Sequence, residues 1–440
     1  MRYSLNFGRL STQPPRRVHG DDTFRIAVLG DFSGRANAGK VEAGAALAGR
    51  KPHRVDVDNF EATVRRWNAV LRLPVGTGGE LIEVKIGSLD DFHPDNLFRS
   101  LPIFRELSSL RRRLKNNSTF AAAAGEMQTW SEFAGHETTV PTSAQSGGSA
   151  MPAGTLNDFA RLLGQSPSPT LRESPVDQLL KRVVAPHIVP AAHPDQAAMV
   201  AVIDEALSAT MRRVLHHPDF QALESLWRSV DLLVRELGTS SQLEIVFYDV
   251  TAQEIAADLS LTDRLETSGL YQLLIEKPAA DQRFGPPSVL VGNFIFELTP
   301  SHAELLGRIG KLASAAGAPF IAGVTTACLT QPGLSEVHPR IPESWTALRQ
   351  MPQAAYLGLT VPRFMLRWPY GAATEPIESF KFEEFTPQYG LRSMLWANGS
   401  ILAGLLLGTT FNEQGLARMN LGSQKTVGGD PVYYYSAADG

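Results

Sequence analysis

The sequence predicts a mixed α/β protein made of two halves. Short apolar strands alternate with amphipathic helices on both sides of the chain's midpoint, which is the pattern of α/β folds. Residues 135–155, GHETTVPTSAQSGGSAMPAGT, are rich in Gly, Ser, Thr and Pro and poor in large apolar side chains, so they read as a joint between the halves. The length of 440 residues allows two or three domains, each with its own core.

The first 20 residues predict an extended N-terminal arm. Tyr3, Leu5 and Phe7 alternate with polar residues and would share one face of a strand, and Pro14 and Pro15 end any regular element. A strand on such a tether is suited to pairing with the sheet edge of another chain. The alternative is a terminus without fixed structure.

The N-terminal half then predicts strands and helices in alternation. Asn59 is placed to cap a helix whose apolar positions are Phe60, Val64, Trp67 and Leu71. The expected order is a strand at 24–29, a strand at 54–58, a helix at 60–73, a strand at 81–87 and a helix from 95 past 107.

The C-terminal half continues the alternation after partly helical arms that reach to about 175. Thr251 is a good N-cap for one of its helices. We expect helices at 176–184, 195–215, 218–234, 251–259, 265–276, 301–316, 345–351 and 391–408, with strands at 242–250, 288–296 and 318–324.

Composition argues against several classes of function. The 41 basic and 45 acidic residues nearly cancel, so no basic excess points to nucleic acid. Cys328 is the only cysteine, which rules out an intrachain disulfide and a Cys-based zinc site. The apolar run at 401–407 is far shorter than the ~20 residues of a membrane helix. The N-terminus has no apolar signal region, so we expect a cytoplasmic protein without membrane insertion.

The turn from Gly30 to Arg35 follows a buried strand and superficially resembles a phosphate loop. A phosphate loop needs a second glycine and then Lys-Ser/Thr, but Arg35 stands at the glycine position and no such pair follows. A turn that ends a strand is the better interpretation. His216 and His217 are adjacent and precede Pro218, so a turn between two helices is favoured over a metal site.

Several aspartates could serve as acid or base but are better explained as caps. Asp56, Asp58, Asp90 and Asp91 stand at strand ends and helix starts, where carboxylates accept hydrogen bonds from free amides. The common hydrolase, metalloprotease and dinucleotide motifs are absent. We therefore expect no enzyme and no catalytic, cofactor-binding or metal-binding residue. An α/β hydrolase or nucleotide-binding enzyme using Asp31, Asp56 and Asp90 is the alternative of another class.

One stretch is specific enough to name a family. Residues 211–228, MRRVLHHPDFQALESLWR, resemble the hallmark of the large subunit of the type VI secretion contractile sheath. Further similar stretches follow in the family's order, and the resemblance covers about 175–440. They are APFIAG at 318–323, WTALRQMPQAAYLGL at 345–359, PRFMLRWPYG at 362–371, FKFEEF at 380–385 and LW at 395–396.

The N-terminal half resembles the small subunit of the same sheath. The motifs are FRIAVLGDFSGR at 24–35, VDVDNF at 55–60 and LDDFHPDNL at 89–97. The chain is thus expected to be a fusion of two subunits that are separate proteins in most such systems. The expected domains are an arm at 1–20, a small-subunit-like domain at 21–134, a linker at 135–175 and a large-subunit-like domain at 176–440.

Two departures from the family pattern are visible. Asn293-Phe294-Ile295-Phe296 stands where large subunits usually have Asp-Tyr-Glu-Phe, so two acidic positions are lost. The sequence ends at PVYYYSAADG, where the family typically continues through a segment that links protomers.

The resemblance implies two packed α/β halves of the contractile-sheath type, with exposed edge strands, that polymerise around an inner tube and contract. Strand exchange between protomers would use Tyr3, Leu5 and Phe7. The implied partners are further copies of the chain, the inner tube protein, a baseplate and an AAA-type recycling ATPase. The motif residues expected in the family core are Asp31, Phe32, Gly34, Arg35, Asp91, Phe92, Pro94, His216, His217, Pro218, Phe220, Leu223, Glu224, Trp227, Arg228, Pro362, Arg363, Pro369, Tyr370 and Gly371.

The helix expected at 176–184 is a candidate contact for that ATPase through Leu179, Leu180 and Val183, although a helix that simply packs in a core is at least as good an interpretation. The alternative within the same family is a sheath-like regulator or assembly factor that does not polymerise.

Overall fold

The computed structural model describes residues 5–11, 23–75, 80–134, 175–184, 195–281, 285–325, 340–388 and 390–419. The chain divides into two compact units. The first contains residues 1–73, 82–98 and 211–440, and the second contains 74–81 and 99–210. The expected linker at 135–175 lies outside the described residues except for its last position, which begins a helix.

A six-stranded sheet forms the centre of the first unit, in the order β2-β5-β1-β6-β7-β8. The strands β5, β1, β6, β7 and β8 are parallel, and β2 runs antiparallel to β5 at one edge. The predicted mixed α/β class is confirmed. The strand bounds are β1 Phe24–Gly30, β2 His53–Val55, β5 Leu243–Asp249, β6 Val289–Phe296, β7 Phe320–Val324 and β8 Leu357–Thr360.

The two halves of the sequence share this sheet. Strand β1 comes from the N-terminal half, yet it lies between β5 and β6 of the C-terminal half, with Ile26 opposite both Ile245 and Val289. Every residue of β1 is buried. A parallel strand covered on both faces needs a continuous apolar run, and the sequence FRIAVLG supplies one apart from the paired Arg25.

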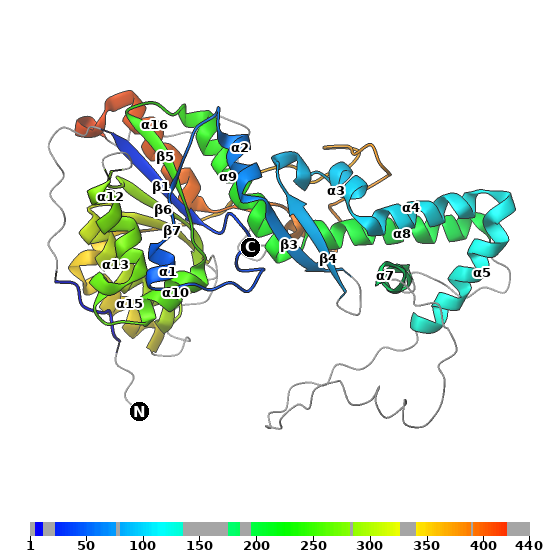
Figure 1. The fold of residues 1–440 in the computed structure, drawn as a ribbon, viewed down its shortest axis with the longest axis horizontal. Helices are drawn as coiled ribbons and strands as arrows, with labels where there is room; N and C mark the ends of the chain where they lie inside the picture. Colours follow the sequence, from blue (N-terminus) through cyan, green and yellow to red (C-terminus); the bar gives the residue numbers. More distant parts are fainter. Residues whose placement is uncertain are drawn as a thin grey trace, which may run out of the picture. The chain divides into compact units, whose positions relative to one another are not determined.

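Helices cover both faces of the sheet (Figure 1). One face carries α9 (Pro218–Leu237) and α16 (Gly399–Gln414), and the other carries α10 (Ala252–Ser260), α13 (Pro300–Ala316) and α15 (Arg340–Gln350). Helix α16 can pack closely against the end of α9 because residue 408 is a glycine. A Cβ atom at this position would lie only 2.6 Å from the side chain of Leu237. Shorter elements are α1 Ala45–Ala48, η3 Leu265–Thr267, α11 Gly269–Tyr271, η4 Gln272–Glu276, α12 Lys277–Ala280, η6 Pro352–Tyr356 and η8 Leu416–Arg418.

The prediction of a helix at 60–73 is correct for its first part and wrong for its second. Helix α2 (Phe60–Trp67) ends at Asn68, which adopts a left-handed conformation with φ 40°, and strand β3 (Ala69–Pro74) follows. Leu71 and Leu73 are buried while Arg72 is exposed, so the period of two overrides the helical spacing. Strand β3 pairs with β4 (Leu81–Ile86), which was predicted.

Three other predicted helices differ from the structure. The helix expected at 265–276 is divided at Ser268, whose backbone is extended, into η3 and the segment that begins with α11. The helix expected from 95 onward is interrupted at Leu101 because Pro102 restricts the residue before it, which gives α3 (Pro94–Ser100) and α4 (Pro102–Lys115). The helix expected at 391–408 starts only at Gly399, where the Asn398 side chain accepts the amide of Ser400. The elements η1 (Leu89–Phe92), β9 (Phe364–Met365), η7 (Gly390–Ser393) and β10 (Trp396–Ala397) complete the first unit.

The second unit is helical. Helix α4 packs against α5 (Asn117–Ala134) and α7 (Pro175–Val184), and Arg111 of α4 forms an ion pair with Asp204 of α8 (Gln196–Leu215). The side chain of Gln196 also donates to the carbonyl of Leu114 at 2.8 Å. Among the described residues, no helix combines the length and apolar character needed to span a bilayer.

Candidate functional site

A buried ion network brings together three of the motif stretches. Nε of Arg367 lies 2.8 Å from Oε1 of Glu224 on α9, and its Nη1 lies 2.7 Å from Oε2 of Glu384. The side chain of Arg367 is 6% exposed and both carboxylates are 0% exposed. One guanidinium therefore links the stretches at 211–228, 362–371 and 380–385.

Further groups complete this network. Nε of Arg228 lies 2.7 Å from Glu224, and Nε2 of His216 lies 3.5 Å from Glu384. The backbone amide of Tyr370 donates to Glu384 at 2.8 Å, and the guanidinium of Arg367 lies 4.3 Å from the centre of the Tyr370 ring. Buried charges are tolerated only when they are paired and hydrogen-bonded in this way.

The network favours the ionised forms of both Glu384 and Arg367. Burial opposes ionisation of Glu384, but Arg367 and hydrogen bonds from His216 and Tyr370 outweigh it and lower the pKa of Glu384 to about 2. Burial likewise disfavours the charged form of Arg367, but Glu224 and Glu384 outweigh it and raise its pKa well above the ordinary value. Because both carboxylates are closed off from solvent, the arrangement is a clamp between chain segments rather than a place for a substrate.

The predicted motif residues around α9 lie in the turn before the helix and on its buried face. His216 and His217 lie between α8 and α9, and Nδ1 of His217 accepts the amide of Asp219 at 3.2 Å, which caps α9 just before Pro218. The buried face of the helix carries Phe220, Leu223 and Trp227.

An aromatic cluster joins the N-terminal motif to the C-terminal half. The ring of Phe32 stacks on Phe247 at 4.7 Å and on Trp67 at 4.9 Å, and it meets Trp227 edge-on at 5.2 Å. The indole of Trp227 also donates to the carbonyl of Phe32 at 3.2 Å. Aromatic pairs of this kind stabilise by about 0.5–1.5 kcal/mol beyond their buried area.

Four backbone amides of the loop after β1 are bound by carboxylates of the chain itself. Asp31 accepts the amides of Arg35 and Ala36, and Asp249 accepts those of Phe32 and Ser33. Burial raises the pKa of Asp31 despite these two bonds. Gly34 has φ +72°, which the turn requires. The loop is thus a strand-ending turn fixed by carboxylates of its own chain.

A second ion network lies next to that loop. Nε of Arg35 is 3.1 Å from Oε1 of Glu254, Nη1 of Arg50 is 2.7 Å from its Oε2, and both arginines also pair with Glu42. Burial opposes ionisation of Glu254, but hydrogen bonds from Arg50 and the Thr251 amide outweigh it and lower the pKa of Glu254 to about 2. Arg35 and Glu254 come from different halves of the sequence, so this network is another tie between them.

The motif at 89–97 provides caps and core residues. Oδ2 of Asp91 accepts the amides of Gly87 and Ser88, each at 2.8 Å, and the Phe92 ring meets Phe220 edge-on at 5.5 Å. Pro94 is buried at the start of α3. Asp95, which the sequence suggested only as a helix start, accepts the backbone amide of Ser379 at 2.9 Å.

The enzyme alternative finds no support in the positions of its aspartates. Asp56 accepts the amide of Asn59 at 2.8 Å, and the hollow of about 220 Å³ beside Asp31 is lined by neither Asp56 nor Asp90. Asp58 is exposed. Within the described ranges, no group of three or more His, Cys, Asp or Glu residues could hold a metal ion.

The remaining motif, at 362–371, contributes Arg367 and Tyr370 to the buried ion network. Pro362 follows a cis peptide bond and is exposed, so it is not a core residue; Arg363 is half-buried, and Pro369 and Tyr370 are buried. A Cβ atom at Gly371 would lie 2.3 Å from a carboxylate oxygen of Glu383, so a side chain there would require that carboxylate to move.

Tyr3 lies outside the described residues, but residues 5–11 of the arm are described. Phe7 packs against Gly307 of α13, where a Cβ atom would come within 2.1 Å of its ring. The carbonyls of Asn6 and Gly8 accept from Arg308 at 3.0 Å and from Lys311 at 2.6 Å, and Arg9 forms a parallel bridge with Arg264. Leu5 is half-buried.

The three candidate contacts on α7 are buried within the second unit. Leu179, Leu180 and Val183 are 5%, 7% and 3% exposed, and α7 packs against α4 and α5. A partner could reach these side chains only after α7 leaves that position.

Sequence reasoning singled out Glu224, Arg228 and His216 of the first network and Arg35 of the second, but it missed other charged members. Arg367 and Glu384 stand inside quoted motifs and were not singled out. Glu254 and Arg50 were not singled out at all. A charged residue inside an otherwise apolar stretch, such as FMLRW at 364–368, is the signal that could have found Arg367.

Comparison with known proteins matches each half to a separate family. Residues 197–437 match the VipB family, described as EvpB/VC_A0108, tail sheath N-terminal domain. Residues 21–128 match the family described as type VI secretion system, VipA, VC_A0107 or Hcp2. The resemblance to both sheath subunits is thereby confirmed.

Two relatives come from Pseudomonas aeruginosa. The type VI secretion system sheath protein TssC1 is 31% identical over 257 residues, which are 55% of this chain and 52% of that protein. The sheath protein TssB1 is 29% identical over 102 residues, which are 22% of this chain and 57% of that protein. The chain thus spans about half the length of each of these relatives.

Proposed function

Because the chain belongs to the VipB family of type VI secretion sheath proteins and carries a VipA-like region ahead of it, we propose that it is a fused structural subunit of a contractile sheath. The subunit polymerises as a helix around an inner tube, and contraction of the helix drives the tube outward. The families that match are structural sheath families, which are non-enzymatic.

The shared sheet is the observation that carries the proposal. Strand β1 of the VipA-like region lies between β5 and β6 of the VipB-like region, and the Phe32 cluster and the Arg35–Glu254 pair join the same two regions. One chain therefore supplies both regions of a protomer. On this basis we assign 21–134 and 176–440 as the two subunit equivalents, with 1–20 as an arm and 135–175 as a linker.

Polymerisation needs contacts that repeat from copy to copy without closing into a ring, since such heterologous contacts generate helices. We propose that the arm, through Tyr3, Leu5 and Phe7, provides one of them by pairing with a neighbouring copy. Its described part is already held mainly by backbone groups, from Asn6 to Arg9. Backbone hydrogen bonds of this kind can be remade with an identical site on another copy.

The proposed partners are further copies of the chain, the inner tube protein and a baseplate, and the proposed compartment is the cytoplasm. A sequence with one cysteine is compatible with a reducing compartment. An AAA-type ATPase would recycle the contracted sheath by gripping α7 through Leu179, Leu180 and Val183. Because these side chains are buried, such an ATPase should bind only when contraction frees the helix.

Electron microscopy of the purified chain, alone and with its cognate tube protein, tests the proposal. We expect long tubes of constant diameter in at least one of the two conditions. Persistent single protomers in both conditions would favour a sheath-like regulator or assembly factor and would overturn the polymer proposal.

The arm is tested by deleting residues 1–10. The shortened chain should remain folded by circular dichroism but form no tubes, because the body keeps its sheet while the link between copies is lost. Tubes of unchanged length would show that the arm is not the link.

A further inference from the structure

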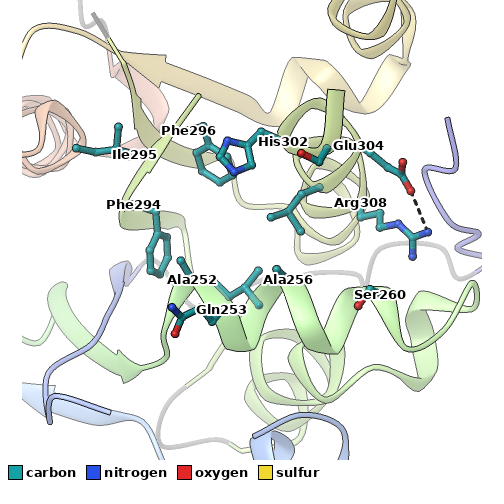
Figure 2. Close-up of a pocket in the computed structure, with 13 residues that line it drawn as sticks. Ala252, Gln253, Ala256, Ser260, Phe294, Ile295, Phe296, His302, Glu304 and Arg308 are labelled. Atoms are coloured by element: carbon teal, nitrogen blue, oxygen red, sulfur yellow. Dashed lines mark hydrogen bonds and ion pairs between the residues drawn. The ribbon is translucent and has the colours of Figure 1, made fainter. Parts of the chain in front are cut away.

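A groove of about 500 Å³ lies between α10 and α13, where Ile295 is 47% exposed (Figure 2). Its lining is mainly apolar and does not by itself select one occupant. The edge of the hairpin formed by β3 and β4 is more specific. Among the described strands, β4 has β3 as its single neighbour, so no described strand pairs with its second edge (Figure 1). Such an edge is a template for another strand.

The register of the hairpin shows which backbone groups face that edge. The amide of Val75 donates to the carbonyl of Glu80, and in this register Arg72 lies opposite Glu83, with Nε of Arg72 3.4 Å from Oε1 of Glu83. The amide and the carbonyl of Arg72 point away from β4, because the side chain of Asn37 binds them at 2.7 and 3.1 Å. In an antiparallel pair, two opposite residues either both face each other or both face away. The amide and the carbonyl of Glu83 therefore face the second edge of β4.

The same direction recurs at Lys85, which lies two residues further along the strand. The second edge of β4 thus presents the backbone amides and carbonyls of Glu83 and Lys85, to which no other part of the described chain is hydrogen-bonded. The edge ends at Gly87, because the amide of this residue donates to Oδ2 of Asp91 at 2.8 Å. The stretch that can accept another strand is therefore centred on Val84.

This stretch is complementary to a second copy of itself. When two β4 strands pair antiparallel about Val84, Glu83 of each copy lies opposite Lys85 of the other, and Ile82 lies opposite Ile86. Each pair of Glu83 and Lys85 exchanges both backbone hydrogen bonds and brings opposite charges together. The side chains of Ile82, Val84 and Ile86 are buried on one face of the hairpin, and this pairing keeps them on the same face of the combined sheet.

The charges and the backbone direction disfavour neighbouring registers. A shift by two residues places Glu83 opposite Glu83, or Lys85 opposite Lys85, and like charges directly opposite each other destabilise a sheet. A shift by one residue sets outward-facing groups against residues whose own amides and carbonyls already face β3. The register centred on Val84 is the one in which both the charges and the hydrogen bonds agree.

We propose that β4 is a contact between two copies of the chain, in which the two hairpins join into one antiparallel sheet in the order β3-β4-β4-β3. The contact is isologous, so it joins two copies and then closes. It therefore differs from the contacts that would propagate a helical polymer, and it does not rest on the proposed function. Because one pair of short strands is a small interface, the dimer is weak and forms only at high concentration.

Disulfide trapping of the full-length chain tests this contact. Every variant carries Cys328→Ser, so the introduced cysteine is the only one. Opposite residues of a hydrogen-bonded pair have Cα atoms about 5.5 Å apart, which suits a disulfide, whereas the two copies of Glu83 are diagonal neighbours about 7–8 Å apart. A mixture of Glu83→Cys and Lys85→Cys chains should therefore give at least fivefold more trapped dimer than either variant alone. Equal yields, or no trapped dimer, would overturn the inference.

Charge reversal tests the register separately. Glu83→Lys places like charges opposite each other and should lower the association constant, measured by sedimentation equilibrium, at least fivefold. The double variant Glu83→Lys/Lys85→Glu recreates the pair with its signs exchanged and should restore the wild-type constant. The matched control is Glu236→Lys, which changes an exposed glutamate on α9 and should leave the constant unchanged.

A double variant that associates as weakly as Glu83→Lys, or a wild-type chain that stays monomeric at every concentration, would contradict the proposed contact. Circular dichroism confirms that each variant keeps its fold. Tubes are scored separately by electron microscopy, and trapping reads the contact whether or not tubes form. A failure of this inference and a failure of the polymer proposal can therefore be told apart.

Discussion

Nε of Arg367 lies 2.8 Å from Oε1 of Glu224, and both side chains are buried. On its other side the same guanidinium reaches Glu384. A single cation therefore neutralises two carboxylates that solvent cannot reach, and three chain segments depend on it.

Removal of this cation should be strongly destabilising. Arg367→Met leaves Glu224 and Glu384 without their shared partner, and breaking a buried pair in this way costs about 3–5 kcal/mol. The measurement is the free energy of unfolding from denaturant titration at pH 7.

The matched control is Arg235→Met, which removes an i,i+4 pair with Asp231 whose arginine is 66% exposed. The control should change the free energy of unfolding by less than about 1 kcal/mol. A similar loss in both variants would show that the buried pair has no special role.

Stability should fall in acid because two buried glutamates have lowered pKa values. The pKa values of Glu384 and Glu254 are about 2 in the folded chain, against an ordinary value of 4.5. A group whose pKa is lowered by folding contributes stability that is complete above its ordinary pKa and is lost as the pH falls toward the folded value. The denaturant midpoint should therefore decrease between about pH 5 and pH 2.

Glu384→Gln should flatten this pH dependence while it lowers stability at pH 7, because the variant no longer releases a proton on folding. Glu83→Gln, at a residue whose side chain is 54% exposed, serves as the control and should keep the wild-type profile. A Glu384→Gln profile that parallels the wild type would contradict the assignment.

The VipB-like region should not fold alone. Expressed as residues 176–440, it lacks β1, so β5 and β6 lose the strand that lies between them and present open edges. We expect insoluble protein from this fragment and soluble complex when residues 1–134 are co-expressed, as measured by size-exclusion chromatography.

The control for this experiment is the intact chain carrying a protease site within 135–175. Cleavage after folding should leave the two pieces together on the column. A soluble, monomeric 176–440 fragment with native circular dichroism would show that β1 is dispensable.

Release of the arm should follow from a single added side chain on α13. Gly307→Val places atoms where the ring of Phe7 lies, so residues 5–11 should detach and exchange amide hydrogens at least tenfold faster. Mass spectrometry of the N-terminal peptide measures the exchange.

Gly125→Ala is the control, because nothing lies within 4 Å of the added Cβ atom and alanine favours the helix by about 0.5–1 kcal/mol. Its arm should stay protected. Equal protection of the arm in Gly307→Val and the wild type would mean that Phe7 does not hold the arm in place.

Most strands and helices could be predicted from local pattern. The apolar run of β1, the Thr251 cap of α10 and the apolar residues four apart along α8 each determine an element through contacts within a few residues. In α8 these residues are Met199, Ile203, Leu207 and Met211. The wrong predictions also have local causes. Asn68 ends α2 in a left-handed conformation, which the spacing of apolar residues does not reveal. Pro102 divides what the apolar spacing had predicted to be one continuous helix.

By itself, then, the sequence determined the α/β class, the order of its elements and the family resemblance of each half, because these depend on neighbouring residues and on motif order. Only the tertiary structure decided that the two halves share one sheet. It also decided that Arg367 joins Glu224 to Glu384, two residues that lie 160 positions apart in the sequence. The physical reason is that strand order and buried ion pairs are set by long-range packing, in which a charged residue becomes tolerable only when its distant partner arrives with it.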